Sequence, residues 1–252
     1  MTRDECVRII SRYETMVERP AGERLTTLAN SHLVAQDGVS DEILETKASE
    51  YASYLPFCEY VDEMIDQDDP LTRQDYAGEL VVLRPTTPAS LLKLGLEQRP
   101  ISCTEHHIWA IMAPDELHGG THHQHGLSPA LVKSIPELLD HPVLVANHPT
   151  SQERMIVVLD AMDEYGYPLI TPMKPEATGI IEMEAIITNL VLSVYGLKNF
   201  WNYFGSAVTP DMVSYIDAAA ERSLVDKIGG APLSGLGNLP RDTVLQKLAC
   251  VG

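Results

Sequence analysis

The sequence is short of basic residues. Its 252 residues include 18 lysines and arginines against 36 aspartates and glutamates, which gives a net charge of −18 at neutral pH. Residues 1–99 carry 10 basic and 19 acidic side chains and residues 100–252 carry 8 and 17, so each part stands at −9. Because lysine and arginine contacts to phosphate supply most non-specific affinity for nucleic acid, this composition excludes a general nucleic-acid coat.

Long apolar runs and paired cysteines are also missing. No apolar run approaches the roughly 20 residues that a membrane-spanning helix needs, and polar residues follow Met1 directly. We therefore expect no membrane contact, no secretory signal and a cytoplasmic location. The cysteines, Cys6, Cys58, Cys103 and Cys250, form no CxxC pair, so neither a disulfide nor a cysteine-based metal site is expected.

What is present describes a folded protein, since 44% of the residues are hydrophobic and only 21% are charged. Its length favours two domains. Residues 1–87 predict a helical module that begins with a capping box at Thr2 and Glu5. Its last helix is expected to be interrupted at Pro56, and the proline-rich segment 84–88 is expected to join residues 88–252.

After this joint the pattern alternates between the two periods of regular structure. Helices are predicted over residues 88–94, 104–112, 128–139, 197–204 and 218–228. Strands are predicted over residues 143–146, 155–160, 169–173, 178–184, 189–194 and 212–216. Helices followed by a meander predict an α+β fold in which helices pack on an antiparallel sheet.

Six of the nine histidines fall within residues 106–125, namely His106, His107, His118, His122, His123 and His125. Three interpretations compete. Imidazoles at positions 122, 123 and 125 could bind zinc or nickel, with His118 or Asp115 completing the shell, but their spacing matches no known metal motif. Histidines could instead act as acid and base without metal, or simply cover a loop surface.

Acid–base cleavage of RNA would also need donors that stabilise the charge developing on phosphate. The basic residues nearest the predicted sheet are Arg154, Lys174 and Lys198. Ser193 and Tyr195 are among the hydroxyl donors. The chemistry therefore has candidate residues, although they are few.

A series of phrases carries a family resemblance. In chain order these are Thr104-Glu105-His106-His107-Ile108, His125-Gly126-Leu127-Ser128, Ile135-Pro136-Glu137-Leu138-Leu139, Met155-Ile156-Val157-Val158-Leu159, Met173-Lys174-Pro175, Ser193-Val194-Tyr195-Gly196 and Tyr215-Ile216-Asp217. Over residues 95–252 the chain resembles the phage MuF C-terminal domain family.

That resemblance implies a barnase, EndoU and RelE-like fold and a metal-independent endoribonuclease of phage or mobile-element origin that acts as a toxin, with no cofactor. Carried over by position, His107 matches the histidine of the early helix and His125 that of the His-Gly-Leu turn. Ser193 and Tyr195 match the Ser-Val-Tyr-Gly segment. His107 and His125 would be the acid–base pair, with Arg154, Lys174 and Lys198 on the substrate.

The charge supports a different interpretation. Where the family commonly has lysine after Tyr215-Ile216-Asp217, this chain has three alanines. The alternative is a catalytically degenerate module that binds a protein through its acidic surface. RNA, an immunity protein and a host protein are therefore all expected partner classes.

Overall fold

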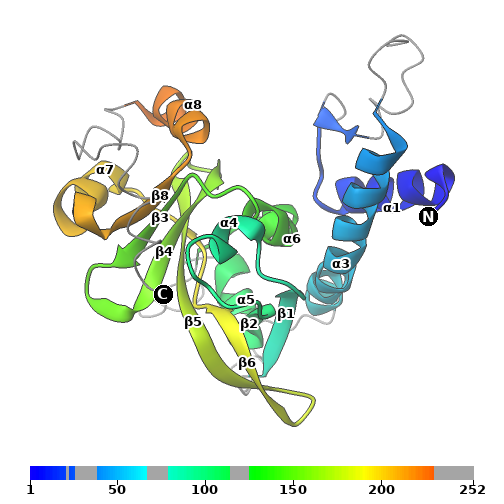
Figure 1. Ribbon diagram of the computed structural model, residues 1–252, viewed down its shortest axis with the longest axis horizontal. Coiled ribbons are helices and arrows are strands. Elements are labelled where there is room, and N and C mark those ends of the chain that lie inside the picture. The colour runs from blue at the N-terminus through cyan, green and yellow to red at the C-terminus, as the bar shows by residue number, and fades with distance from the viewer. Residues whose placement is uncertain (21–22, 26–38, 67–78, 114–124, 230–252) are drawn as a thin grey trace. The chain divides into compact units, whose positions relative to one another are not determined.

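The computed structural model describes residues 1–20, 23–25, 39–66, 79–113 and 125–229 (Figure 1). The chain divides into two compact units. Unit 1 contains residues 1–72 and 128–135, and unit 2 contains residues 73–127 and 136–252. The boundary predicted between residues 87 and 88 remains a prediction of how the chain is organised.

Unit 1 is built around two helices, α1 (Arg3–Met16) and α3 (Asp41–Asp66). The predicted capping box is confirmed: the Thr2 hydroxyl accepts from the Glu5 N–H, and the Glu5 carboxylate accepts from the Thr2 N–H. The predicted interruption at Pro56 is wrong, because α3 continues through it.

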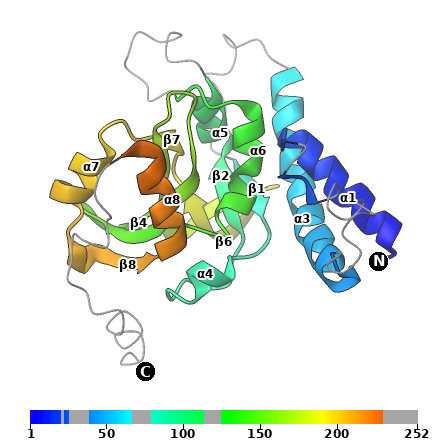
Figure 2. The same ribbon diagram turned by 90° about the horizontal axis from the view of Figure 1, so that it is seen from above.

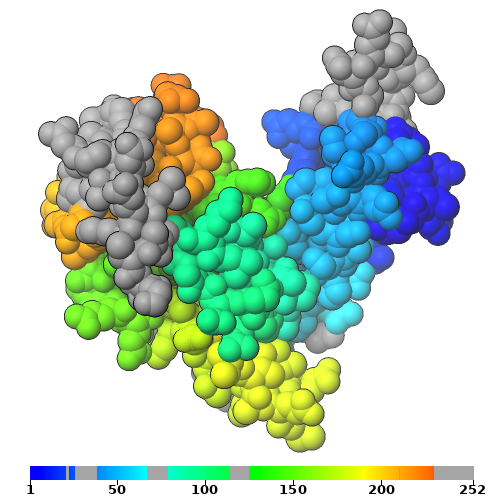
Figure 3. All heavy atoms as spheres, in the orientation of Figure 1, coloured from blue at the N-terminus to red at the C-terminus, as the bar shows by residue number. Residues whose placement is uncertain are grey.

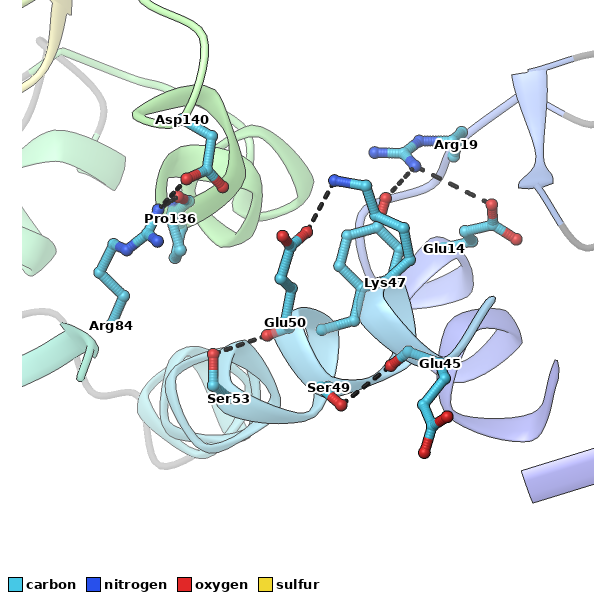
Figure 4. A network of polar contacts seen from close by, with 11 residues as sticks. Glu14, Arg19, Glu45, Lys47, Ser49, Glu50, Ser53, Arg84, Pro136 and Asp140 are labelled. Carbon is cyan, nitrogen blue, oxygen red and sulfur yellow. Dashed lines mark hydrogen bonds and ion pairs between the residues drawn. The ribbon is translucent and has the colours of Figure 1, made fainter. Parts of the chain in front are cut away.

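The core of unit 1 forms where α1 meets α3, and its aromatic part is the stacked pair Tyr13 and Tyr51, with ring centroids 4.2 Å apart. Glu14 is fully buried beside them, and its carboxylate accepts from the N–H of Leu25. The Arg19 guanidinium lies 3.9 Å from that carboxylate and donates to the Tyr51 hydroxyl at 2.9 Å (Figure 4). The buried carboxylate of Glu14 thus has both a hydrogen-bond donor and a nearby cation. Its contacts with Leu25 and Arg19 hold the segment that follows α1 against the helix.

Unit 2 is an eight-stranded sheet with helices, which confirms the α+β prediction. Its strands are β1 (Leu80–Arg84), β2 (Ile101–Thr104), β3 (Leu144–His148), β4 (Ser151–Met162), β5 (Pro168–Ile181), β6 (Glu184–Val191), β7 (Tyr195–Gly196) and β8 (Val213–Ile216). They follow the order β1-β2-β6-β5-β4-β3-β8, with β7 paired to β5. The meander β3-β4-β5 is confirmed.

The sheet is mixed, and the expectation of a wholly antiparallel sheet is wrong. β2 pairs with β6 in parallel, with Cys103 opposite Val191, while the other pairs are antiparallel. Neither β1 nor β2 was among the predicted strands, and β1 lies in the segment assigned to the helical module. β1 is a short apolar run, in which periodicity cannot separate a buried strand from a helix, and β2 has only four residues, too few to show a period.

A buried polar network explains why β2 joins the sheet beside β6. The amide nitrogen of Asn189 on β6 donates to the Thr87 hydroxyl at 3.0 Å and to the Glu97 carbonyl at 3.2 Å. The Thr188 hydroxyl donates to the carbonyl of Pro100 at 2.8 Å. These bonds hold the segment between β1 and β2, which includes α4 (Ala89–Leu92), against β6.

Helices α5 (Glu105–Met112) and α6 (Pro129–Leu138) lie between β2 and β3 in the chain. The last turn of α6 is tied to β1 within unit 2 by Arg84. Its Nη1 donates to the Pro136 carbonyl at 3.0 Å and to the Asp140 carboxylate at 2.8 Å (Figure 4). Arg84 is 6% exposed, so this pair is shielded from solvent and fixes the end of the helix.

The C-terminal helices pack on one face of the sheet. They are α7 (Phe200–Asn202), the π-helix η4 (Tyr203–Ala207), the 3-10 turn η5 (Pro210–Met212) and α8 (Ala218–Ile228) (Figure 2). Phe200, Phe204 and Leu224 bury their side chains against Val158 and Ile170 of the sheet. Asp217 caps α8 by accepting from the N–H of the second and third residues of the helix, and these bonds lower the pKa of its carboxyl.

Candidate functional site

A bulge separates β6 from β7 along the same side of β5. Val191 pairs with Met173 and Tyr195 pairs with Ile170. The chain therefore advances four residues from Val191 to Tyr195 while the facing strand advances three, from Met173 to Ile170. The extra residue breaks the alternation of side chains, as bulges next to active sites commonly do. Ser193 lies in this bulge, after Leu192 and before β7. The N–H of Leu192 donates to the Pro172 carbonyl at 2.9 Å.

The segment that carries His125 is held by the end of α5. The N–H groups of His125, Gly126 and Leu127 donate to carbonyls of Ala110, Ala113 and Ile111 at 3.1, 3.1 and 2.9 Å. Helix ends leave such carbonyls without partners inside the helix. Gly126 has φ of +61°, which glycine adopts at little cost, so the turn places His125 next to the helix.

His125, Ser193 and Tyr195 form one cluster in unit 2. The His125 Nε2 lies 3.0 Å from the Ser193 Oγ, and its ring stacks on that of Tyr195 with centroids 5.0 Å apart and planes 28° apart. The ring nitrogen accepts from the serine hydroxyl when it is unprotonated and donates when it is protonated. Three of the four predicted catalytic residues are thus brought together from segments 68 residues apart.

The tyrosine of the cluster remains a hydrogen-bond donor at neutral pH. Burial raises the pKa of Tyr195. Burial, and after it the nearby Tyr195, raises the pKa of Tyr203 to about 12. Tyr203 opens the π-helix η4, a distortion often found at functional sites. Nothing in the sequence pattern distinguished it from the other aromatic residues of the predicted helix 197–204.

His107 lies in the first turn of α5. Its N–H donates to the hydroxyl of the capping residue Thr104 at 3.2 Å, and its Nδ1 lies 2.9 Å from the same oxygen. Burial, followed by the neighbouring His106, lowers the pKa of His107. Within the described part of the chain its hydrogen-bond and ring contacts are with Thr104 and His106, so the two predicted acid–base histidines do not touch.

The predicted phosphate contacts divide into two places. Met155 on β4 pairs with Met173 on β5. Arg154 precedes the first of these methionines and Lys174 follows the second, so the two cations are neighbours across the antiparallel strands. Lys174 forms a 2.9 Å ion pair with Glu153. Lys198 lies elsewhere, exposed after β7.

The other histidines give no described metal site. His118, His122 and His123, together with Asp115, lie outside the described residues. Among the residues that the structure does describe, no group of three or more histidine, cysteine or acidic side chains is arranged to hold a metal ion. His148 is the last residue of β3, where burial and then Arg154 lower its pKa.

Gly196, the last residue of the Ser-Val-Tyr-Gly segment, shapes the cluster of His125, Ser193 and Tyr195. A Cβ on Gly196 would lie 1.9 Å from the Asp163 carboxylate. That carboxylate accepts from the N–H groups of Tyr165 and Tyr167 at 2.9 and 2.8 Å, so it cannot move freely. Close approach of the β4–β5 turn to β7 therefore requires glycine beside Tyr195.

Comparison with known proteins supports a narrower version of the predicted resemblance. Residues 116–221 match the family described as the phage MuF-C-terminal domain, whereas the resemblance was predicted over residues 95–252. The match contains His125, Ser193 and Tyr195, and His107 lies before it. No curated protein and no solved structure matches the chain.

Among the residues that the structure describes, every helix is too short or too polar to cross a bilayer. The longest, α3, runs over Asp41–Asp66 and has charged residues in both its first and its last turns.

Proposed function

We propose that unit 2 is a metal-independent endoribonuclease of phage or mobile-element origin that acts as a toxin, with His125 at the centre of its site. The observation that carries this proposal is the cluster of His125 with Ser193 and Tyr195. An imidazole beside two hydroxyl donors provides both a proton carrier and groups that stabilise a negatively charged phosphate. The match of residues 116–221 to a phage domain family supports the proposed origin.

The reaction needs a base, an acid and no metal. The base removes the proton of a ribose 2′-hydroxyl, the 2′-oxygen forms a bond to phosphorus, and the bond from phosphorus to the 5′-oxygen breaks. The acid protonates that oxygen, which leaves a 2′,3′-cyclic phosphate and a 5′-hydroxyl. In-line attack places the attacking and leaving oxygens on opposite sides of phosphorus, so base and acid need not touch.

The environments of the two histidines support different roles for them. The lowered pKa of His107 keeps its ring neutral near pH 7 and suits it to be the base. His125, when protonated, donates from Nε2, where Ser193 now lies. The hydroxyls of Ser193 and Tyr195 donate to the non-bridging oxygens of the phosphate.

Lys174 is the cation proposed for an adjoining phosphate. Residues 170, 172 and 174 of a strand share one face, so Lys174 lies on the face of Ile170, the residue paired with Tyr195. Its partner Glu153 has a 76% exposed side chain. Exposed ion pairs are weak, so a phosphate can replace this carboxylate. Arg154 lies beside Lys174, and Lys198 contacts the substrate on the other side of β7.

The test is cleavage of an end-labelled RNA in EDTA by the full chain and three variants, His125→Ala, His107→Ala and Ser193→Ala. We expect a rate lower by about 10²- to 10⁴-fold for each histidine variant, and products that end in 2′,3′-cyclic phosphate. His141→Ala is the matched control, since His141 is exposed outside the cluster. An RNA with 2′-deoxyribose at the cleaved position should resist.

Two outcomes contradict the proposal. Cleavage at the same rate by wild type and His125→Ala places the activity elsewhere. Absence of cleavage by the wild-type protein on every RNA tested leaves the alternative, a module that binds protein through its acidic surface, which the net charge of −18 favours.

A further inference from the structure

Strands β5 and β6 continue beyond the rest of the sheet as a two-stranded arm, residues 177–188. Among the described strands, β4 pairs with β5 only up to Met173, and β2 pairs with β6 only from Asn189 onward. Between these limits the strands pair only with each other, from Ala177 opposite Thr188 to Ile181 opposite Glu184. Figure 1 shows the arm extending away from the other strands of unit 2.

The two faces of the arm differ. One face carries Gly179, whose missing side chain leaves room for Leu80 of β1: a Cβ there would lie 2.2 Å from the leucine Cδ1. The other face carries the cross-strand pairs Thr178 with Ile187 and Ile180 with Ala185. All four of these side chains are exposed, and Ile180 and Ile187 are 52% and 48% exposed.

The turn at the end of the arm adds a further exposed apolar side chain. Glu182 and Met183 have φ of +48° and +68°, values that hairpin turns of this kind usually obtain with asparagine and glycine. Met183 is 93% exposed. The chain thus accepts strain at the turn while displaying a flexible, polarizable apolar side chain, as adaptable binding surfaces do.

Single exposed apolar residues are ordinary on protein surfaces, but a group on one face indicates a binding site. Here Ile180, Met183 and Ile187 share one projecting element (Figure 3). The charged residues of this segment are all acidic: from residue 175 to residue 197 the sequence has Glu176, Glu182 and Glu184 and no lysine, arginine or histidine.

We propose that this apolar face of the β5–β6 arm docks into an apolar groove of a partner protein whose rim carries lysine and arginine. Charge complementarity identifies the partner class, since basic side chains around the groove would meet the three glutamates. A second copy of the chain would bring like charges together, and RNA would add phosphate to them. The proposal is independent of cleavage at His125.

The test uses a random peptide library displayed on phage as the probe, selected on the immobilised full chain and counter-selected on the double variant Ile180→Ser/Ile187→Ser. We expect enriched peptides that combine apolar residues with lysine or arginine. A synthetic peptide of the enriched sequence should bind the double variant at least about tenfold more weakly than wild type, and Glu182→Gln/Glu184→Gln should also weaken it, with less dependence on salt.

The control is Ile43→Ser on α3, since Ile43 is 51% exposed and lies in unit 1. This variant should bind the peptide like wild type. Because the substituted side chains are half exposed, all variants should keep the wild-type melting temperature, which separates loss of binding from loss of folding.

Three results would overturn the proposal. These are selection that yields no peptide dependent on the arm, enrichment of peptides without basic residues, and a concentration-dependent dimer in sedimentation that the double variant abolishes. The last would assign the face to a second copy of the chain. RNA cleavage by the double variant should equal that of wild type, so failure here is distinguishable from failure of the ribonuclease proposal.

Discussion

At the scale of single residues, His107 shows how one hydroxyl can serve two purposes. The Thr104 oxygen accepts the His107 N–H and lies 2.9 Å from its Nδ1. Once the lone pair of the oxygen accepts that N–H, its own proton can go to an unprotonated Nδ1. This arrangement and burial both favour the neutral ring, consistent with its lowered pKa.

A dependence of stability on pH follows. Because the folded pKa of His107 is below the unfolded value of 6.5, the unfolded chain binds the proton first as pH falls. The stability from the neutral ring is therefore present above the unfolded pKa and is lost as pH falls through the folded pKa. Denaturant titrations across this range should show a smaller loss of unfolding free energy for His107→Asn than for wild type.

The control for this prediction is His106→Asn, since His106 is exposed on the same helix and is the smaller of the two causes that lower the pKa of His107. It should keep most of the wild-type pH dependence. Equal pH dependence in wild type and His107→Asn would contradict the link between this ring and stability. His148 adds to the slope in the same direction, because burial lowers its pKa as well, so only part of the slope should disappear.

Glu153 offers a test of the proposed role of Lys174. The carboxylate forms a 2.9 Å ion pair with Lys174, and this contact lowers its pKa. Glu153→Gln removes a negative charge that competes with phosphate for Lys174. We expect a KM for RNA lower by about two- to fivefold with kcat unchanged. Glu164→Gln, at the exposed β4–β5 turn, is the charge-matched control and should change neither constant.

At the scale of elements, the bulge between β6 and β7 shapes the candidate site. The regular alternation of a strand would give Ser193 and Tyr195 the same face. Across the extra residue both side chains still contact one ring: Ser193 reaches the His125 ring by its hydroxyl, and Tyr195 reaches it by its own ring. Both contacts depend on β7 remaining against β5, where the Leu197 N–H donates to the Pro168 carbonyl at 2.9 Å.

Gly196 tests this dependence. In Gly196→Ala the new Cβ would overlap the Asp163 carboxylate, so β7 or the β4–β5 turn must move. We expect a loss of about 1–3 kcal/mol of unfolding free energy, the usual cost of overpacking, measured by denaturant titration. Gly205→Ala is the control because nothing lies within 4 Å of a Cβ there. A Gly196→Ala variant as stable as wild type would show that the close approach is not required.

At the scale of the whole molecule, charge limits the strength of the proposed binding to RNA. Only three cations, Arg154, Lys174 and Lys198, are proposed to meet phosphate, while the chain carries a net charge of −18. Each contact to a single strand contributes about −0.7 to the slope of log K against log salt, so the slope should be no steeper than about −2. Binding titrations over a series of salt concentrations measure it.

The comparison of interest is with Lys174→Gln, which should reduce the slope by about 0.7. A slope much steeper than the expected value would mean that cations outside this group contact the RNA. An unchanged slope in Lys174→Gln would remove this residue from the interface.

The sequence by itself determined the local structure where the signal is local. The capping box at Thr2 and Glu5, the meander β3-β4-β5 and α8 after Asp217 each depend on neighbouring residues, and each was predicted. The α+β class follows from the order of such segments. The family resemblance also predicts His125, Ser193 and Tyr195 as site residues from their positions in the sequence alone.

Tertiary structure decided the rest, because it depends on residues far apart in the chain. The parallel pairing of β2 with β6 depends on Asn189 reaching Thr87 and Glu97, and no periodicity records such a contact. The turn at Glu182 and Met183 contains no glycine, asparagine or proline, so the sequence pattern predicts one strand over residues 178–184 that runs through it. The lack of basic residues limits the chemistry from the start, but only the fold determined which histidine lies beside Ser193 and Tyr195.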